Sequence, residues 1–323
     1  MTWALATALR PELAPVRETV MHISEQKQVG DQSRYEQRAR YLANENGFAF
    51  SYPPVPAHQF KAEYKRAVDS QAPTGPIMLD ASDTLDTAYP ATTPTLLCRY
   101  LRVRAGERFS VTYVASGEVS FVMSGRGEST NGADSLSWRQ GDVFCLPGGV
   151  ETTYRADADT LLFNVTDEPL LAFAGARAPE EGRSSVEAVV WRSKEIERHL
   201  EAVYQRAITE NTTGSSVQFS TRRTEPNYTT IPFINVAMNT LAAGCDQRPH
   251  RHNGVAVTLA IQGEGIHSLI EGERIEWVTG VAQVTPATAL HSHHNRGEKR
   301  MRSLVIQDEG LHVYTRTPGF SFD

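Results

Sequence analysis

From about residue 92 onwards, short apolar runs alternate with glycine and proline, which is the pattern of a protein built from short strands. Residues 97–103 alternate between two faces, and residues 119–123 and 143–146 are further apolar runs. A second series begins near Ile231, where residues 256–262 alternate and Glu271-Gly272 separates two apolar segments as a hairpin turn would. Many short strands joined by such turns predict an all-β barrel or jelly roll.

Two segments carry other patterns. Residues 34–46 are rich in helix formers, and the prolines at 53, 54 and 56 predict extended chain after them. Apolar residues at helical spacing between Ile196 and Tyr204 predict a helix that Ser193 could cap, and residues 211–216 are predicted to be a polar loop.

These patterns predict four parts. They are an N-terminal helical and extended arm at 1–91, a first β-unit at 92–172, a linker with a helix at 173–230, and a second β-unit at 231–323. An arm of this kind most often packs on the body of the protein or on a neighbouring subunit.

Three histidines in the second unit are the strongest chemical signal in the chain. His250 and His252 are two residues apart, so in a strand their side chains project from the same face. His291 follows a Gly280…Pro286 turn that would bring it in from a neighbouring strand. Three neutral imidazoles suit iron, zinc, copper or nickel, so this pattern predicts one metal ion per chain.

The glycine and proline frame around these histidines occurs twice. Gly244 lies 138 residues after Gly106, and Gly280 lies 139 residues after Gly141, which indicates an internal duplication. Counted from the glycines, Thr112, Val114 and Thr152 stand in the first copy where the second copy has histidines. Glu118 alone cannot hold a metal, so the first copy is predicted to be metal-free and structural.

Composition narrows the class of protein. A hydrophobic fraction of 40% allows a real core, and a net charge of −6 gives no electrostatic reason to expect binding to nucleic acid or to an anionic membrane. The three cysteines have neither paired nor zinc-like spacing, and no signal peptide or membrane span is apparent, so a cytoplasmic location is expected.

The frame Gly244…His250-x-His252…Gly263 followed by Gly280…Pro286…His291…Asn295 resembles the two motifs of the cupin superfamily. Its duplication resembles a bicupin, which implies a duplicated double-stranded β-helix. The family usually has its active metal in the first copy, whereas the histidines of this chain place it in the second copy. The stretches RPHRHNGVAVTLAIQGEG and TPATALHSHHNRG are similar to gentisate 1,2-dioxygenase and its relatives, which cleave salicylate, 1-hydroxy-2-naphthoate or nitrosalicylate.

The resemblance implies an iron(II) enzyme that cleaves the ring of an aromatic acid with O2, and a homo-oligomer such as a dimer or tetramer. Its three histidine ligands match His250, His252 and His291. A further family histidine matches His293, which could orient substrate or move a proton, and Asp308 matches a family aspartate.

Two departures bear on specificity. Many cupins have a glutamate ligand where this chain has Ala256, and relatives that cleave gentisate or salicylate have a carboxylate-binding arginine where it has Thr258. Gln262 shares strand parity with Thr258 and is expected to face the cavity unless a bulge intervenes. A salicylate-type substrate other than gentisate is therefore expected. The alternatives to a ring-cleaving dioxygenase are another metal-dependent cupin enzyme, such as an isomerase, hydrolase or decarboxylase, and a non-catalytic binding cupin.

Overall fold

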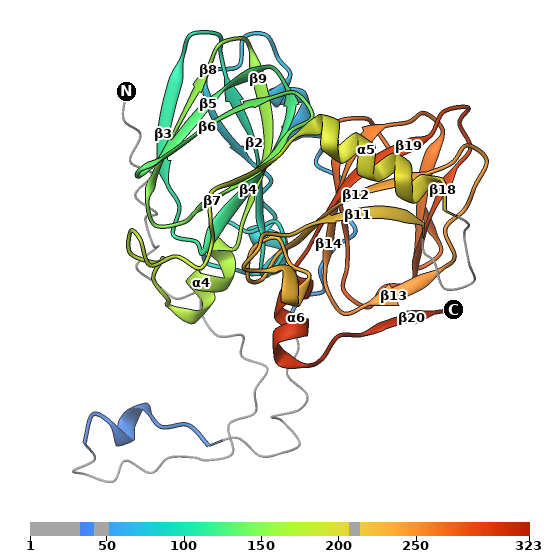
Figure 1. Cartoon of the computed structure of the whole chain (residues 1–323). Helices are drawn as coiled ribbons and strands as arrows, with labels where there is room; N and C mark the ends of the chain where they lie inside the picture. The colour runs from blue at the N-terminus through green and yellow to red at the C-terminus, as the bar shows by residue number, and fades with distance from the viewer. Residues whose placement is uncertain (1–32, 42–51, 207–213) are drawn as a thin grey trace.

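The computed structural model describes residues 33–41, 52–206 and 214–323. These residues form two β-barrels that lie side by side, the first mainly green and the second mainly orange in Figure 1. Each barrel consists of two antiparallel sheets. This confirms the predicted all-β, duplicated jelly-roll architecture.

The first barrel has a six-stranded sheet in the order β1-β2-β9-β4-β7-β10 and a four-stranded sheet in the order β3-β8-β5-β6. The strands of the larger sheet are β1 (Gly75–Met78), β2 (Leu97–Val103), β4 (Gly117–Ser124), β7 (Val143–Pro147), β9 (Thr160–Thr166) and β10 (Val189–Trp191). The strands of the smaller sheet are β3 (Arg108–Thr112), β5 (Arg126–Asn131), β6 (Asp134–Arg139) and β8 (Glu151–Ala156).

The second barrel has two five-stranded sheets, in the orders β11-β12-β19-β14-β17 and β16-β15-β18-β13-β20. The strands of one sheet are β11 (Ser215–Phe219), β12 (Asn235–Leu241), β14 (Ala256–Gln262), β17 (Ala282–Thr285) and β19 (Met301–Gln307). The strands of the other are β13 (His250–His252), β15 (Ile266–Ile270), β16 (Glu273–Glu276), β18 (His291–Asn295) and β20 (Phe320–Phe322). The predicted hairpin joins β15 to β16, where Glu271 and Gly272 have φ of 48° and 84°. Strand β11 takes up residues 215–216 of the predicted polar loop, and residues 211–213 lie outside the described residues.

The described helices are short, and η1 lies apart from the barrels (Figure 1). They are η1 (Glu36–Arg38), α2 (Lys61–Ala67), α3 (Ser82–Leu85), α4 (Glu168–Ala174), α5 (Ser193–Tyr204), η2 (Glu225–Asn227) and α6 (Glu309–Thr315). None of these described helices has the length and apolar character needed to cross a membrane.

Two helix predictions need correction. Helix α5 has the predicted apolar face, but Ser193 is its first helical residue and makes no side-chain cap. Instead the carboxylate of Asp142, in the first barrel, accepts a hydrogen bond from the Ser193 N–H at 2.8 Å. In the described part of the helix predicted at 34–46, a single 3₁₀ turn, Glu36–Arg38, forms, because Ala39 is extended with ψ of 141°. Residues 42–46 of that predicted helix lie outside the described residues.

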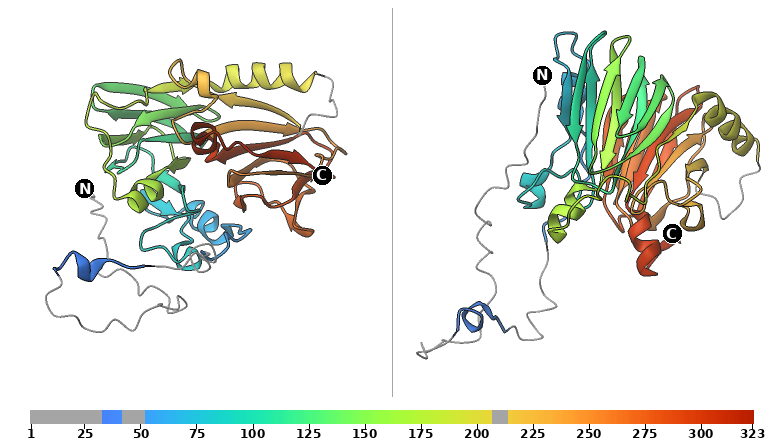
Figure 2. Two further views of the ribbon diagram at one scale, coloured as in Figure 1. Left: turned by 90° about the horizontal axis from the view of Figure 1, so that it is seen from below. Right: turned by 60° about the vertical axis from the view of Figure 1, so that its left-hand side comes forward.

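The largest core lies between the barrels. The six-stranded sheet and the β12-containing sheet pack face to face, as Figure 2 shows, and side chains such as Phe163, Val257 and Leu304 fill the space between them. The Tyr100 hydroxyl crosses this interface and donates to the Gly280 carbonyl at 2.7 Å. The two barrels therefore form one body.

The two barrel interiors differ. The first is filled by a large apolar cluster that includes Phe109, Trp138 and Tyr154. The buried cluster inside the second barrel contains only Leu241, Ile266 and Met301, packed with Cys245 and Trp277. The second barrel is thus the one with room for a site.

Candidate metal centre

The three histidines predicted to bind metal meet inside the second barrel. His250 and His252 lie on β13 and His291 lies on β18, where it pairs directly with His250. Their ligand nitrogens all lie within 4.8 Å of one another. Nitrogens bound to one metal at about 2.1 Å are at most about 4.2 Å apart, so a small inward rotation of the rings would complete a site.

Backbone carbonyls fix the tautomer of all three rings. Nδ1 of His250 lies 2.9 Å from the Arg248 oxygen, Nδ1 of His252 lies 2.6 Å from the Gly254 oxygen, and Nδ1 of His291 lies 2.9 Å from the Ala289 oxygen. A carbonyl can only accept, so each Nδ1 carries the proton and each Nε2 presents a lone pair. This arrangement orients three metal-binding atoms.

Burial keeps these rings neutral. Burial lowers the pKa of His250 and of His252, and burial together with the two neighbouring histidines lowers the pKa of His291 to about 3. Neutral imidazole is the form that binds a metal, so the residues present fit a divalent transition metal.

A cavity of about 270 Å³ opens onto the three rings, close to the size of pockets that hold small ligands. Its described lining contains neither arginine nor lysine. Besides the histidines, its polar lining includes amide side chains, which belong to Gln218, Asn239, Gln247 and Gln307. Phe320 of the C-terminal strand β20 closes one side and stacks on His250, with ring centroids 5.4 Å apart.

His293 also lines this cavity, as its parity with His291 predicts. Its Nδ1 lies 2.9 Å from the hydroxyl of Ser268. That hydroxyl oxygen already accepts hydrogen bonds from Trp277 Nε1 at 2.7 Å and Gln283 Nε2 at 3.1 Å. Its own proton must therefore go to His293 Nδ1, which leaves the ring proton on Nε2. His294 points away, towards Asp246 and the ring of His267.

Of the three residues predicted to contact substrate, Ala256 and Thr258 line the cavity and Gln262 does not. The register between β14 and β19 shifts between Ala260 and Gln262. This bulge turns the Gln262 side chain outwards, where its Nε2 donates to the Arg300 carbonyl at 3.1 Å. The prediction for Gln262 was therefore wrong.

Asp308 lies behind the cavity wall and does not line it. Its carboxylate accepts hydrogen bonds from the Thr95 hydroxyl at 2.6 Å and the Val255 N–H at 2.8 Å, and the residue directly precedes helix α6. Burial raises its pKa. Asp308 therefore holds the turn that follows His252, and the contacts that it makes are those of a positioning residue.

The first barrel repeats this geometry without the ligands. Val111 pairs with Thr152 as His250 pairs with His291, so Val111 and Tyr113 are the true counterparts of the β13 histidines. Thr112 and Val114 are exposed, which corrects the predicted correspondence by one residue. The reason is that the chain needs six residues from Gly244 to His250 and only five from Gly106 to Val111.

The Glu118 carboxylate lies inside the first barrel and is hydrogen-bonded to neighbouring side chains there. It accepts hydrogen bonds from Thr152 Oγ1 at 2.8 Å, from Asn164 Nδ2 at 2.7 Å and from the Tyr154 hydroxyl. Burial raises its pKa. Neighbouring side chains of the first barrel therefore satisfy this carboxylate.

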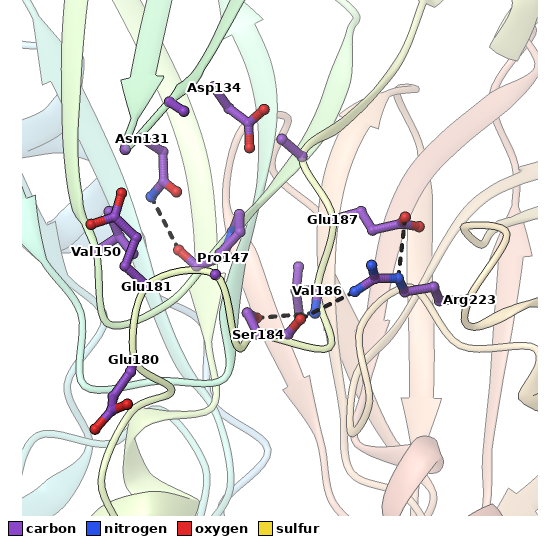
Figure 3. Close-up of a pocket in the computed structure, with 14 residues that line it drawn as sticks. Asn131, Asp134, Pro147, Val150, Glu180, Glu181, Ser184, Val186, Glu187 and Arg223 are labelled. Atoms are coloured by element: carbon purple, nitrogen blue, oxygen red, sulfur yellow. Dashed lines mark hydrogen bonds and ion pairs between the residues drawn. The ribbon is translucent and has the colours of Figure 1, made fainter.

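A larger cavity of about 470 Å³ lies on the first barrel, away from the histidines (Figure 3). Its acidic lining includes Glu180 and Glu181, and Arg223 forms an ion pair across it with Glu187 at 3.2 Å. None of its lining residues is a histidine or cysteine, so the chemistry of the chain is concentrated in the smaller cavity.

The described residues combine two β-barrels with a histidine-rich centre in the second barrel. Residues 237–307, which hold all three metal-binding candidates, match the cupin domain family. In a 134-residue stretch the chain is 31% identical to a 5-aminosalicylate 1,2-dioxygenase from Comamonas sp., and the match covers 38% of this chain and 35% of that relative. The chain thus matches only about a third of the length of this curated relative.

Solved structures show the fold over nearly the whole chain. The salicylate 1,2-dioxygenase of Pseudaminobacter salicylatoxidans superposes with a TM-score of 0.73 at 15% identity, covering 89% of this chain and 95% of that one. The same enzyme as an adduct with gentisate gives a TM-score of 0.70 at 14% identity, covering 87% and 89% of the two chains. The chain has the bicupin fold of these proteins.

The sequence analysis missed several residues of the site. Ser268 and Trp277 lie 139 residues after Ser129 and Trp138, which form the same hydrogen bond in the first barrel. The duplication would have identified that pair. Gln307 and Glu309 had no such signal, because only the folded chain brings the end of β19 to the cavity.

Proposed function

We propose that the chain is an iron(II)-dependent, extradiol-type dioxygenase that cleaves the ring of a hydroxylated aromatic acid of the salicylate class. The observation that carries this proposal is the set of three Nε2 lone pairs that backbone carbonyls orient into one cavity. The similarity to a 5-aminosalicylate 1,2-dioxygenase and the fold shared with salicylate 1,2-dioxygenase support the same chemistry.

His250, His252 and His291 would hold the iron. When bound, iron(II) would supply ligand positions for O2 and for the phenolic oxygen of the substrate, whose pKa ligation lowers. Ala256 supports this reading, because its small side chain leaves open the face where many cupins place a fourth protein ligand.

His293 is the proposed proton-handling group. Ser268 keeps its Nδ1 as an acceptor, so the Nε2–H is the proton that His293 can offer to a ligand in the cavity. Burial lowers the pKa of His293 well below its usual value, so the ring is neutral and serves as a hydrogen-bond donor.

Amides take the place of the arginine that the cavity lacks. Gln307 Nε2 lies 3.2 Å from His252 Nε2, and a metal bound to that lone pair would release the amide towards a ligand. Gln307 and Thr258 are therefore the proposed partners of the substrate carboxylate, in addition to the metal. A homo-oligomeric state and a cytoplasmic location stay predictions from the sequence.

The test is an anaerobic purification with metal analysis, followed by iron(II) loading and O2 uptake with salicylate, 5-aminosalicylate and gentisate. We expect one iron per chain and products that contain both oxygen atoms. His293→Ala should lower turnover by about 10²–10⁴-fold and keep the metal. His294→Ala is the matched control, since its ring lies on the outer face. A protein that transforms no aromatic acid with iron but acts with zinc, manganese or nickel would favour another cupin enzyme.

A further inference from the structure

The duplication offers an internal comparison for one cavity residue, Glu309. Glu309 is the first residue of α6 and directly follows Asp308 at the end of β19. Glu168 is the first residue of α4 and directly follows Asp167 at the end of β9. The two glutamates therefore occupy the same position in the two barrels.

In the first barrel the protein itself satisfies the glutamate. The guanidinium of Arg99, whose side chain is only 2% exposed, forms an ion pair with Glu168. The Thr166 hydroxyl donates to the same carboxylate oxygen at 2.7 Å. The buried guanidinium and the partly buried carboxylate here compensate each other.

In the second barrel the cation is missing. Arg99 pairs with Asn164 across β2 and β9, and Ala237 pairs with Val305 across β12 and β19, so Ala237 stands where the first barrel has Arg99. Ala237 and Glu309 both line the metal cavity. The Glu309 Oε2 atom is buried and has no hydrogen-bond partner among the described residues.

Other unpartnered acceptors border the same cavity. Asn239 Oδ1 and Gln247 Oε1 are buried and have no hydrogen-bond partner within the described part of the chain, and Gln247 is 6% exposed. An amide can rotate to present its NH₂ group, but a carboxylate can only accept when it is ionised. Glu309 is the acid of the described lining, and in its ionised form it can accept from a ligand but cannot donate to it.

We propose that Glu309 determines specificity by accepting a hydrogen bond from an amino substituent on the aromatic acid. This inference rests on the proposed function. The amino group would stand where Arg99 stands in the first barrel. It offers two N–H donors, so Glu309 and one neighbouring amide could both be satisfied. A nitro group presents only acceptors and would leave the carboxylate buried and unpaired, which is costly.

The test measures binding separately from turnover. Salicylate, 5-aminosalicylate and 5-nitrosalicylate are titrated anaerobically into the iron(II)-loaded protein by calorimetry, with wild type, Glu309→Gln and Glu273→Gln. Glu273 is an exposed residue of β16 and serves as the matched Glu-to-Gln control. We expect wild type and the control to bind the amino compound at least about tenfold more tightly than the nitro compound, which is the strength of a hydrogen bond to a charged group.

Glu309→Gln should reduce that ratio by about tenfold, while metal content and circular dichroism stay unchanged. An unchanged ratio in the folded, metal-loaded variant would overturn the inference. If the variant fails to fold, the wild-type ratio decides, and equal or tighter binding of the nitro compound would overturn it. Selective binding without O2 uptake would refute the proposed dioxygenase and leave the role of Glu309 intact. O2 uptake without this selectivity would support the proposed dioxygenase and refute the role of Glu309.

Discussion

Replacing Ser268 with alanine should affect both stability and catalysis, for reasons that can be separated. The Ser268 hydroxyl contacts His293, Trp277 and Gln283 at 2.9, 2.7 and 3.1 Å. Its loss leaves the half-buried Trp277 N–H and the buried Gln283 N–H without their acceptor. A buried group left unsatisfied costs about 1–3 kcal/mol, so Ser268→Ala should lower the free energy of unfolding by about 2–5 kcal/mol.

The first barrel contains the control for this change. Ser129 accepts from Trp138 Nε1 at 2.9 Å in the same way, but no histidine adjoins it. Ser129→Ala should therefore cost about 1–3 kcal/mol and leave turnover per folded, metal-loaded molecule unchanged. Unfolding would be followed in urea, with turnover measured by O2 uptake at a temperature where both variants are folded.

Catalysis should fall only in Ser268→Ala. Without the hydroxyl donor, His293 can place its proton on Nδ1, and the Nε2–H that faces the ligand is lost from part of the population. We expect turnover to fall at least about tenfold, within the range typical of general acid–base groups. Nitrogen NMR shifts of His293 in the zinc-loaded protein would report the tautomer directly. A Ser268→Ala protein that is destabilised, as Ser129→Ala is, but keeps the wild-type turnover and the wild-type tautomer of His293 would refute this reasoning.

Three further outcomes are expected. The double variant His250→Ala/His291→Ala should retain no stoichiometric metal by elemental analysis, because one imidazole cannot hold it, and a full metal complement would contradict the assigned ligands. Burial raises the folded-state pKa of Glu118, so the free energy of unfolding should fall as pH rises from its unfolded pKa of about 4.3 through the raised value. Glu118→Gln should flatten that part of the urea-derived stability profile, and an identical slope in the variant would count against it. Gentisate should show a lower kcat/KM in O2 uptake than 5-aminosalicylate, since its 5-hydroxyl offers Glu309 one donor where the amino group offers two, and a gentisate value far above the others would count against this role of Glu309.

The sequence was sufficient for the features that depend on local spacing. The two-residue interval between His250 and His252 fixes their shared face once a strand is assumed, and Glu271-Gly272 fixes the hairpin. The repeated glycines identified the duplication. These predictions succeed because strand parity and left-handed turns are properties of a few adjacent residues.

The prediction of side-chain direction failed where a bulge interrupts the regular alternation of a strand. Gln262 was placed by parity, but a bulge lies between it and Ala260. The first barrel has the same irregularity between Val122 and Ser124, yet the residues in both places are ordinary strand residues with no glycine to mark the bulge. Asp308 lies outside the cavity lining, and its predicted catalytic role stays a prediction. Whether a residue after a strand faces the cavity or caps the next helix depends on tertiary packing, which a motif match does not contain.

The comparison of the two barrels explains why one repeat contains a cavity and the interior of the other is filled. At equivalent positions, large or paired side chains of the first barrel are replaced in the second by small or ligand-binding ones: Arg99 by Ala237, Glu118 by Ala256, Tyr113 by His252 and Tyr154 by His293. Each replacement removes volume or an internal partner from the barrel interior. The strand framework is unchanged, because the shared core between the barrels and the repeated Trp–Ser hydrogen bond do not depend on those positions. The cavity can therefore change its ligand by substitution at interior positions, while the filled barrel packs behind the β12-containing sheet, which lines the cavity opposite the histidine strands.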